Sequence, residues 1–110
     1  MISSVLALVA AASAAQASDT TRTAREAFTA CLRTYVNRSI EARTSAETFE
    51  AEYPQQCTAQ EAAFREAVVR RDTAMRATRA TAEDSARLEI EDARANFSEY
   101  FAAGITPRSQ

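Results

Sequence analysis

Two cysteines, Cys31 and Cys57, are the residues of this 110-residue chain whose chemistry is predicted most directly. Their wide separation excludes a C-x-x-C redox pair, whereas an oxidising compartment would favour a structural disulfide. Such a bond requires Cα atoms within about 7 Å of each other. We predict an intramolecular Cys31–Cys57 disulfide. The alternatives are two unpaired thiols in the core or a bridge between two copies of the chain.

Other site chemistry is limited by what the sequence lacks. The chain has no histidine, which excludes histidine-based triads and histidine–metal sites. Its one glycine, Gly104, cannot form a glycine-rich phosphate loop. Carboxylates gather between Glu41 and Glu61, as a solvated face or as a weak divalent-cation site. The sequence predicts no enzymatic activity, no cofactor and no metal.

The N-terminal residues have the pattern of a signal peptide. An uncharged apolar run covers residues 5–12, and Ala15-Gln16-Ala17 forms an A-x-A cleavage site before Ser18. The run is shorter than the roughly 20 residues that span a bilayer. We therefore predict a signal peptide over residues 1–17, no membrane span in the mature chain 18–110, and a periplasmic or secreted location. The alternative is an alanine-rich helix belonging to the fold.

The charge is nearly balanced, with 13 basic and 15 acidic residues and a net charge of −2. Nucleic-acid binding usually requires a basic face, so nucleic acid is not a predicted partner. Every basic residue is arginine. This reflects either codon composition or a surface selected for bidentate contacts with carboxylates.

The elements that position the cysteines are predicted to be helices, because one glycine and two prolines are too few for the turns of a β-sandwich. Apolar residues spaced by three and four from Ala24 to Ile40 predict a first helix, which a capping box at 23–26 would start. Pro54 ends a short second helix. A break at 37–39 or at 44–47 must turn the chain so that Pro54 returns to the level of Cys31.

A third helix is predicted to begin at the capping box 58–61 and to run to about Ala102 without a glycine or proline. A break at 81–84 is the alternative. Acid–arginine pairs four residues apart should support this helix; they are Glu61/Arg65, Glu66/Arg70, Asp72/Arg76 and Glu83/Arg87. The predicted fold is all-α, a short helical hairpin plus one long C-terminal helix, joined by one disulfide and preceded by a signal peptide.

The large apolar side chains available for a core include Met75 and Leu88. Near the C-terminus, Phe97, Tyr100 and Phe101 form an aromatic cluster that is either core or a self-association patch. On a projecting helix such a patch would lie far from the other aromatic residues. The long helix is therefore a predicted surface for coiled-coil contact with a protein partner or a second copy.

The framework Phe28-x-x-Cys31-Leu32, then Phe49, then Cys57-x-x-x-Glu61-x-x-Phe64-Arg65 resembles small exported helical proteins of high-GC Gram-negative bacteria. The resemblance implies a periplasmic location and no activity. The expected function is non-enzymatic binding or scaffolding in the periplasm. The alternative is a periplasmic holdase-type chaperone or envelope-stress protein, whose small, arginine-rich helical hairpins have a similar look.

Overall fold

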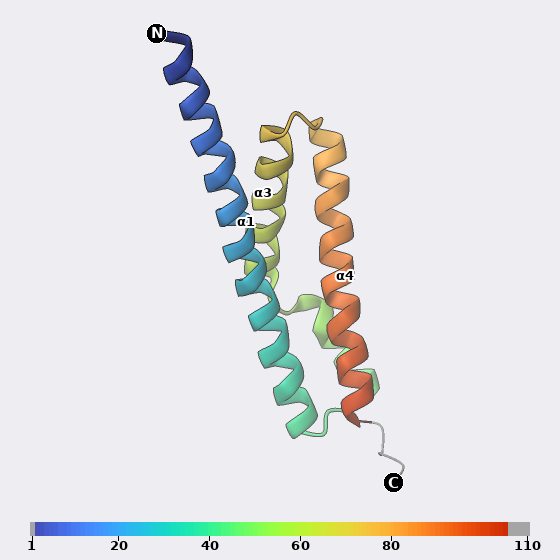
Figure 1. Cartoon of the computed structure of the whole chain (residues 1–110). Helices are drawn as coiled ribbons and strands as arrows, with labels where there is room; N and C mark the ends of the chain where they lie inside the picture. Colours follow the sequence, from blue (N-terminus) through green and yellow to red (C-terminus); the bar gives the residue numbers. More distant parts are fainter. Residues whose placement is uncertain (1, 106–110) are drawn as a thin grey trace.

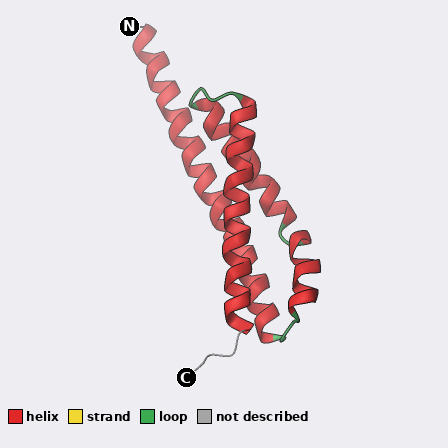
Figure 2. Ribbon diagram, turned by 90° about the vertical axis from the view of Figure 1, so that its right-hand side faces the viewer, coloured by secondary structure: helices red, strands yellow, loops and turns green. Residues whose placement is uncertain are grey.

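The computed structural model describes residues 2–105 of the chain, with side chains described for residues 15–104. Every regular element in this range is helical: α1 (Ile2–Glu41), α2 (Ala46–Glu52), the 3-10 turn η1 (Tyr53–Gln55), α3 (Thr58–Ala74) and α4 (Arg79–Ile105). The helices α1, α3 and α4 pack side by side as a bundle, and α2 lies beside the half of α4 that is distant from the α3–α4 turn (Figures 1 and 2). The predicted all-α fold is confirmed.

The prediction of one long C-terminal helix is wrong. The chain reverses at residues 75–78, and α4 runs antiparallel to α3 (Figure 1). Arg76 adopts a left-handed conformation with φ of 70°. The Ala77 amide then donates to the Asp72 carbonyl at 2.9 Å, which is the Schellman way of ending a helix. Glycine usually occupies this left-handed position, so its absence concealed the turn.

A threonine starts α4 on the other side of the same turn. The Thr78 hydroxyl accepts from the Thr81 amide at 3.2 Å, which satisfies one of the free N–H groups of the first turn. The helix therefore begins at Arg79, two residues before the predicted alternative break at 81–84.

The first reversal has the same construction. Arg43 is left-handed with φ of 56°, and the Thr44 amide donates to the Ser39 carbonyl at 2.9 Å. Ser45 caps α2 by accepting from the Thr48 amide at 3.1 Å. Of the two predicted breaks, the one at 44–47 is close to the observed turn, whereas residues 37–39 remain helical.

Replacing Arg43 or Arg76 with glycine should raise the free energy of unfolding by about 0.5–1 kcal/mol each, because glycine adopts φ > 0 without steric cost. Urea denaturation followed by circular dichroism measures the change. Arg38→Gly is the matched control, since Arg38 lies in the last turn of α1 with right-handed geometry; it should lower stability by about 1 kcal/mol. Destabilisation by all three variants would contradict the assignment of the two turns.

At its N-terminal end, α1 continues through residues 23–26, so the capping box predicted there does not start the helix. Within residues 15–104 the first buried side chain is Thr21, whose hydroxyl donates to the Ala67 carbonyl at 3.2 Å. The side chains of Ala15 and Ala17 are not buried, and every described buried side chain follows the predicted cleavage site. The signal peptide stays a prediction, and no helix within residues 2–105 has both the length and the hydropathy of a bilayer span.

Aromatic rings fill the core where α1, α2 and α4 meet. Phe49 of α2 stacks on Phe101 of α4 with 3.8 Å between ring centroids and on Tyr53 at 4.7 Å. Leu32 and Val36 of α1 are fully buried beside these rings. Toward the α3–α4 turn the buried residues become small: they include Ala67, Ala82 and Ala86. Alanine buries little area but allows the helices to approach closely.

Charged side chains connect the three long helices where the core is small. Glu89 of α4 accepts from Arg25 of α1 at 2.9 Å and from Arg71 of α3 at 3.1 Å. Arg71 also pairs with Asp72 at 2.9 Å. These side chains are only partly exposed, so the network is screened less by solvent than an isolated surface pair.

Three large apolar side chains expected in the core are instead exposed: Met75, Leu88 and Tyr100. Met75 lies in the α3–α4 turn, which the sequence did not reveal. Phe97 and Phe101 are buried, because the reversal at 75–78 returns α4 to the other aromatic residues instead of projecting it. Of the aromatic cluster predicted as an interaction patch, only Tyr100 lies on the surface.

Candidate functional site

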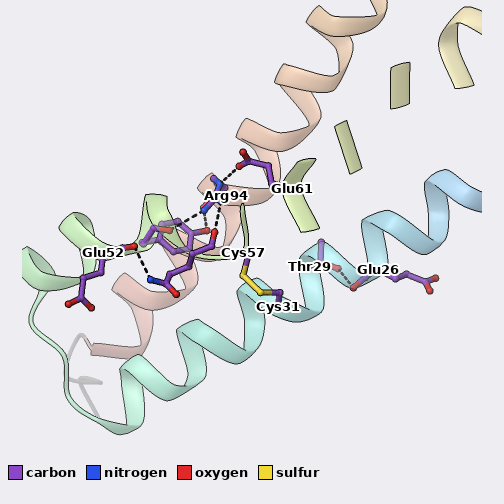
Figure 3. The surroundings of a disulfide bond; sticks show 9 residues. Glu26, Thr29, Cys31, Glu52, Cys57, Glu61 and Arg94 are labelled. Carbon is purple, nitrogen blue, oxygen red and sulfur yellow. Dashed lines mark hydrogen bonds and ion pairs between the residues drawn. A yellow bond between two sulfur atoms is a disulfide. The ribbon is translucent and has the colours of Figure 1, made fainter. Parts of the chain in front are cut away.

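The disulfide connects the C-terminal half of α1 to the start of α3. Cys31 and Cys57 are bonded with an S–S distance of 2.04 Å and a Cα–Cα distance of 6.0 Å, as predicted (Figure 3). Cys57 adopts φ of 61° and immediately precedes α3. The bond therefore fixes α1 to the kink, by which we mean residues 53–57 between α2 and α3.

Arg94 of α4 holds the same kink from the opposite side. Its guanidinium donates to the Gln56 carbonyl at 2.7 Å, to the Tyr53 carbonyl at 3.2 Å and to the Glu61 carboxylate at 2.6 Å (Figure 3). The kink interrupts the α-helical hydrogen bonding at these carbonyls, and that of Tyr53 also accepts from the Gln56 amide at 3.0 Å. The planar guanidinium, with five N–H donors, can serve three acceptors at once.

The capping role predicted for Glu61 is not found. The expected capping box would have used Thr58 as the N-cap and turned Glu61 back to the backbone. Instead Cys57 occupies the N-cap position with no side-chain cap, and the Glu61 carboxylate binds Arg94. No sequence pattern announced Arg94, because two of its three acceptors are backbone carbonyls.

The Tyr53 hydroxyl donates to the Arg94 carbonyl at 2.8 Å. Burial raises the pKa of Tyr53 to about 12, and the Arg94 guanidinium offsets only part of this effect. An unfolded tyrosine has a pKa of about 10. The folded state thus favours the neutral phenol, and this contribution to stability is complete below pH 10 and is lost as the pH rises through 12.

Tyr53→Phe should therefore lower the free energy of unfolding by about 1 kcal/mol at pH 8, where it removes one hydrogen bond. Between pH 10 and 12 its stability should fall less steeply than that of the wild type. Urea denaturation at pH 8, 10 and 11.5 measures both effects. Tyr100→Phe, at an exposed tyrosine, should change neither value; identical pH profiles for Tyr53→Phe and the wild type would contradict the buried hydrogen bond.

A surface groove of about 770 Å³ lies between α3 and α4. We call it the arginine groove, and its lining residues are Ala62, Arg65, Glu66, Val69, Arg70, Arg79, Glu83 and Arg87. The residues from α3 recur at intervals of three and four and those from α4 at intervals of four, so each set lies along one side of its helix. None of the lining residues belongs to α1.

Ion pairs within each helix form the sides of the arginine groove. Two of the four predicted pairs are present, Glu61–Arg65 at 3.5 Å and Glu66–Arg70 at 2.6 Å. The other two predicted pairs are replaced. Asp72 pairs with its neighbour Arg71, and Glu83 pairs with Arg79 at 3.1 Å. The fourth arginine of the groove, Arg87, contacts Asp84 and Glu91.

The arginine groove has the features of a surface for another helix. Small or branched apolar residues, Ala62 and Val69, lie between longer charged ones, an arrangement that lets a helix approach while its polar groups pair with guanidinium groups. The structure does not support the predicted alternative of a weak cation site at residues 41–61. Among the described side chains, no three acidic, histidine or cysteine residues converge as metal ligands.

The comparisons with known proteins do not assign this site. The resemblance of the cysteine framework to small exported helical proteins stays a prediction from the sequence. Protein-family models, curated proteins and solved structures were all compared with the chain, and none of them matches it.

Proposed function

We propose that this protein is exported and non-enzymatic, and that it acts in the periplasm by binding a helical segment of a protein partner in the arginine groove. The observation that carries the proposal is the groove itself, with four arginines and two apolar residues along two antiparallel helices. The disulfide and Arg94 support it, because both hold the kink from which α3 begins. A rigid scaffold loses less conformational entropy on binding.

The charges of the groove indicate the chemistry of the partner. The lining contains four arginines and two glutamates. Surface pairs such as Arg70–Glu66 and Arg79–Glu83 contribute little to stability and exchange readily. A helix that presents carboxylates beside small apolar residues would meet both the free guanidinium donors and the apolar floor.

The alternative function, a holdase-type chaperone, would need a continuous apolar surface. Among the side chains of residues 15–104, the exposed large apolar ones are Met75, Leu88 and Tyr100. Leu88 and Tyr100 are about 18 Å apart along α4, and Met75 lies in the turn before that helix. These separated residues favour specific binding in the groove over general holdase activity.

Site-specific photo-crosslinking in cells tests the proposal. A photoreactive amino acid replaces Ala62, which is an exposed residue of the groove, and in a matched variant it replaces Ala30, which is an exposed alanine of α1. We expect a discrete protein adduct from position 62 and none from position 30. Equal labelling at both positions, or no adduct at position 62, would overturn the proposed function.

A further inference from the structure

The helix α2 presents an acidic surface that nothing else in the described chain neutralises. Its seven residues include Glu47, Glu50 and Glu52 and no basic residue. Glu47 and Glu50 are exposed, and no ion pair joins either of them to another side chain within residues 15–104. They are three positions apart, so they lie on the same side of the helix, while Phe49 enters the core.

The arginine groove has the complementary charge. Its four arginines exceed its two glutamates, and each guanidinium has five donors. Arg70 and Arg79 each use one of these donors on a carboxylate of their own helix. Both side chains are more than two-thirds exposed, so donors remain for carboxylates from another molecule.

The dimensions of the two surfaces also agree. The seven residues of α2 extend about 10 Å, and the lining from Ala62 to Arg70 or from Arg79 to Arg87 extends about 12 Å. Ala46 and Ala51, which flank Glu47 and Glu50, are exposed and small enough for close helix contact.

The two surfaces lie at opposite ends of the bundle. The α3–α4 turn marks one end, and α2 lies beside the other half of α4 (Figure 2). Within one molecule α2 therefore cannot occupy the groove. An antiparallel pairing of two molecules would place each α2 beside the groove of the other, and a two-fold axis would form the same contact twice.

We infer that the groove is occupied by α2 of a second copy of this chain, in an antiparallel homodimer. The inference rests on the proposed function, because it names the helical partner of that same groove. The contacts pair Glu47 and Glu50 of one protomer with the arginines that line the groove of its partner. Since these charges are exposed at the rim, the dimer should weaken as salt screens them.

Sedimentation equilibrium of the mature protein tests the dimer. At 50 mM salt we expect a dimer whose dissociation constant rises at least tenfold in Glu47→Arg/Glu50→Arg. Adding Arg70→Glu and Arg79→Glu to the same chain should restore dimerisation, because the charges are then exchanged on both surfaces. Glu26→Arg/Glu41→Arg makes an equal charge change at exposed residues of α1 and should leave the dissociation constant unchanged.

Circular dichroism of each variant shows whether it is folded, and the exchanged variant distinguishes lost pairing from lost structure. A wild-type protein that is monomeric at 100 µM, or a dimer that the α2 reversal leaves unchanged, would overturn the inference. If the photo-crosslink at position 62 then captures a different protein, the dimer fails and the proposed function stands. A monomer without any adduct at position 62 would remove both.

Discussion

Replacing Cys31 and Cys57 together with alanine is expected to lower the free energy of unfolding by about 3–4 kcal/mol. The bond closes a loop with a sequence separation of 26, and the chain-entropy model assigns this amount to a loop of that length. The loss is large for a domain whose total stability is of the order of 5–15 kcal/mol. Urea denaturation of the mature protein, before and after reduction, measures it independently of mutation.

The position of the disulfide also predicts where the structure loosens. Cys57 is the residue from which α3 begins, so removing the bond should speed amide hydrogen exchange first in α2 and the kink. Amides in the middle of α4 serve as the internal control. If reduction left the urea midpoint unchanged, the bond would not be stabilising the bundle, and the predicted role of the two cysteines would be wrong.

Replacing Arg94 with methionine should lower the free energy of unfolding by about 3 kcal/mol. The substitution keeps much of the side-chain volume but removes the guanidinium that donates to the Gln56 and Tyr53 carbonyls and to the Glu61 carboxylate. The Tyr53 carbonyl keeps the Gln56 amide, and Glu61 keeps only the longer contact with Arg65 at 3.5 Å. The side chains of Arg94 and Glu61 are at most one-fifth exposed, and removing one partner of such a pair leaves a poorly solvated charge.

Arg65→Met is the matched control for this prediction. Arg65 contacts the same carboxylate at 3.5 Å but is about half exposed, so its loss should cost less than about 1 kcal/mol. Arg94→Lys should resemble Arg94→Met more than the wild type, because an ammonium group cannot reach three acceptors in the geometry of the guanidinium. Equal effects of the methionine variants at positions 65 and 94 would show that the contacts with the kink carbonyls contribute nothing.

The fold class and the disulfide were predictable because they depend on strong signals. A chain with one glycine, many alanines and apolar residues at helical spacing has few alternatives to a helical bundle. The cysteine pairing followed from the predicted export, and the requirement that the two cysteines meet predicted a break that returns Pro54 to the level of Cys31. The Ser45 cap lies within one residue of a predicted start.

The reversal at residues 75–78 was not predictable by the same reasoning. Arginine takes the left-handed position that glycine usually fills, and the cap of α4 is Thr78 with Thr81 in the place of the usual glutamate. Between Val69 and Leu88 the sequence has only one large apolar residue, Met75. Such a sparse stretch is equally typical of a polar, projecting helix, whereas here it reflects a turn and the small residues beyond it.

The arginine groove depends on that reversal. Its two sides come from α3 and α4, which were predicted as a single helix. No sequence pattern could therefore bring Arg65 and Arg87 together. The absence of lysine allows two interpretations, codon composition or a surface for contacts with carboxylates, and neither places the arginines in space. The arrangement of the groove arginines depends on the α3–α4 turn, and the contacts of Arg94 depend on the kink. Neither the groove nor these contacts could be predicted without those two features.

The central claim is an exported helical protein whose bundle is held by one disulfide, and the intact mass of the protein recovered from its cells tests this most directly. We expect the mass of residues 18–110 less two hydrogens, with no thiol modified by alkylation until a reductant is added. A chain that retained Met1 and carried two freely alkylated thiols would contradict both the export and the disulfide.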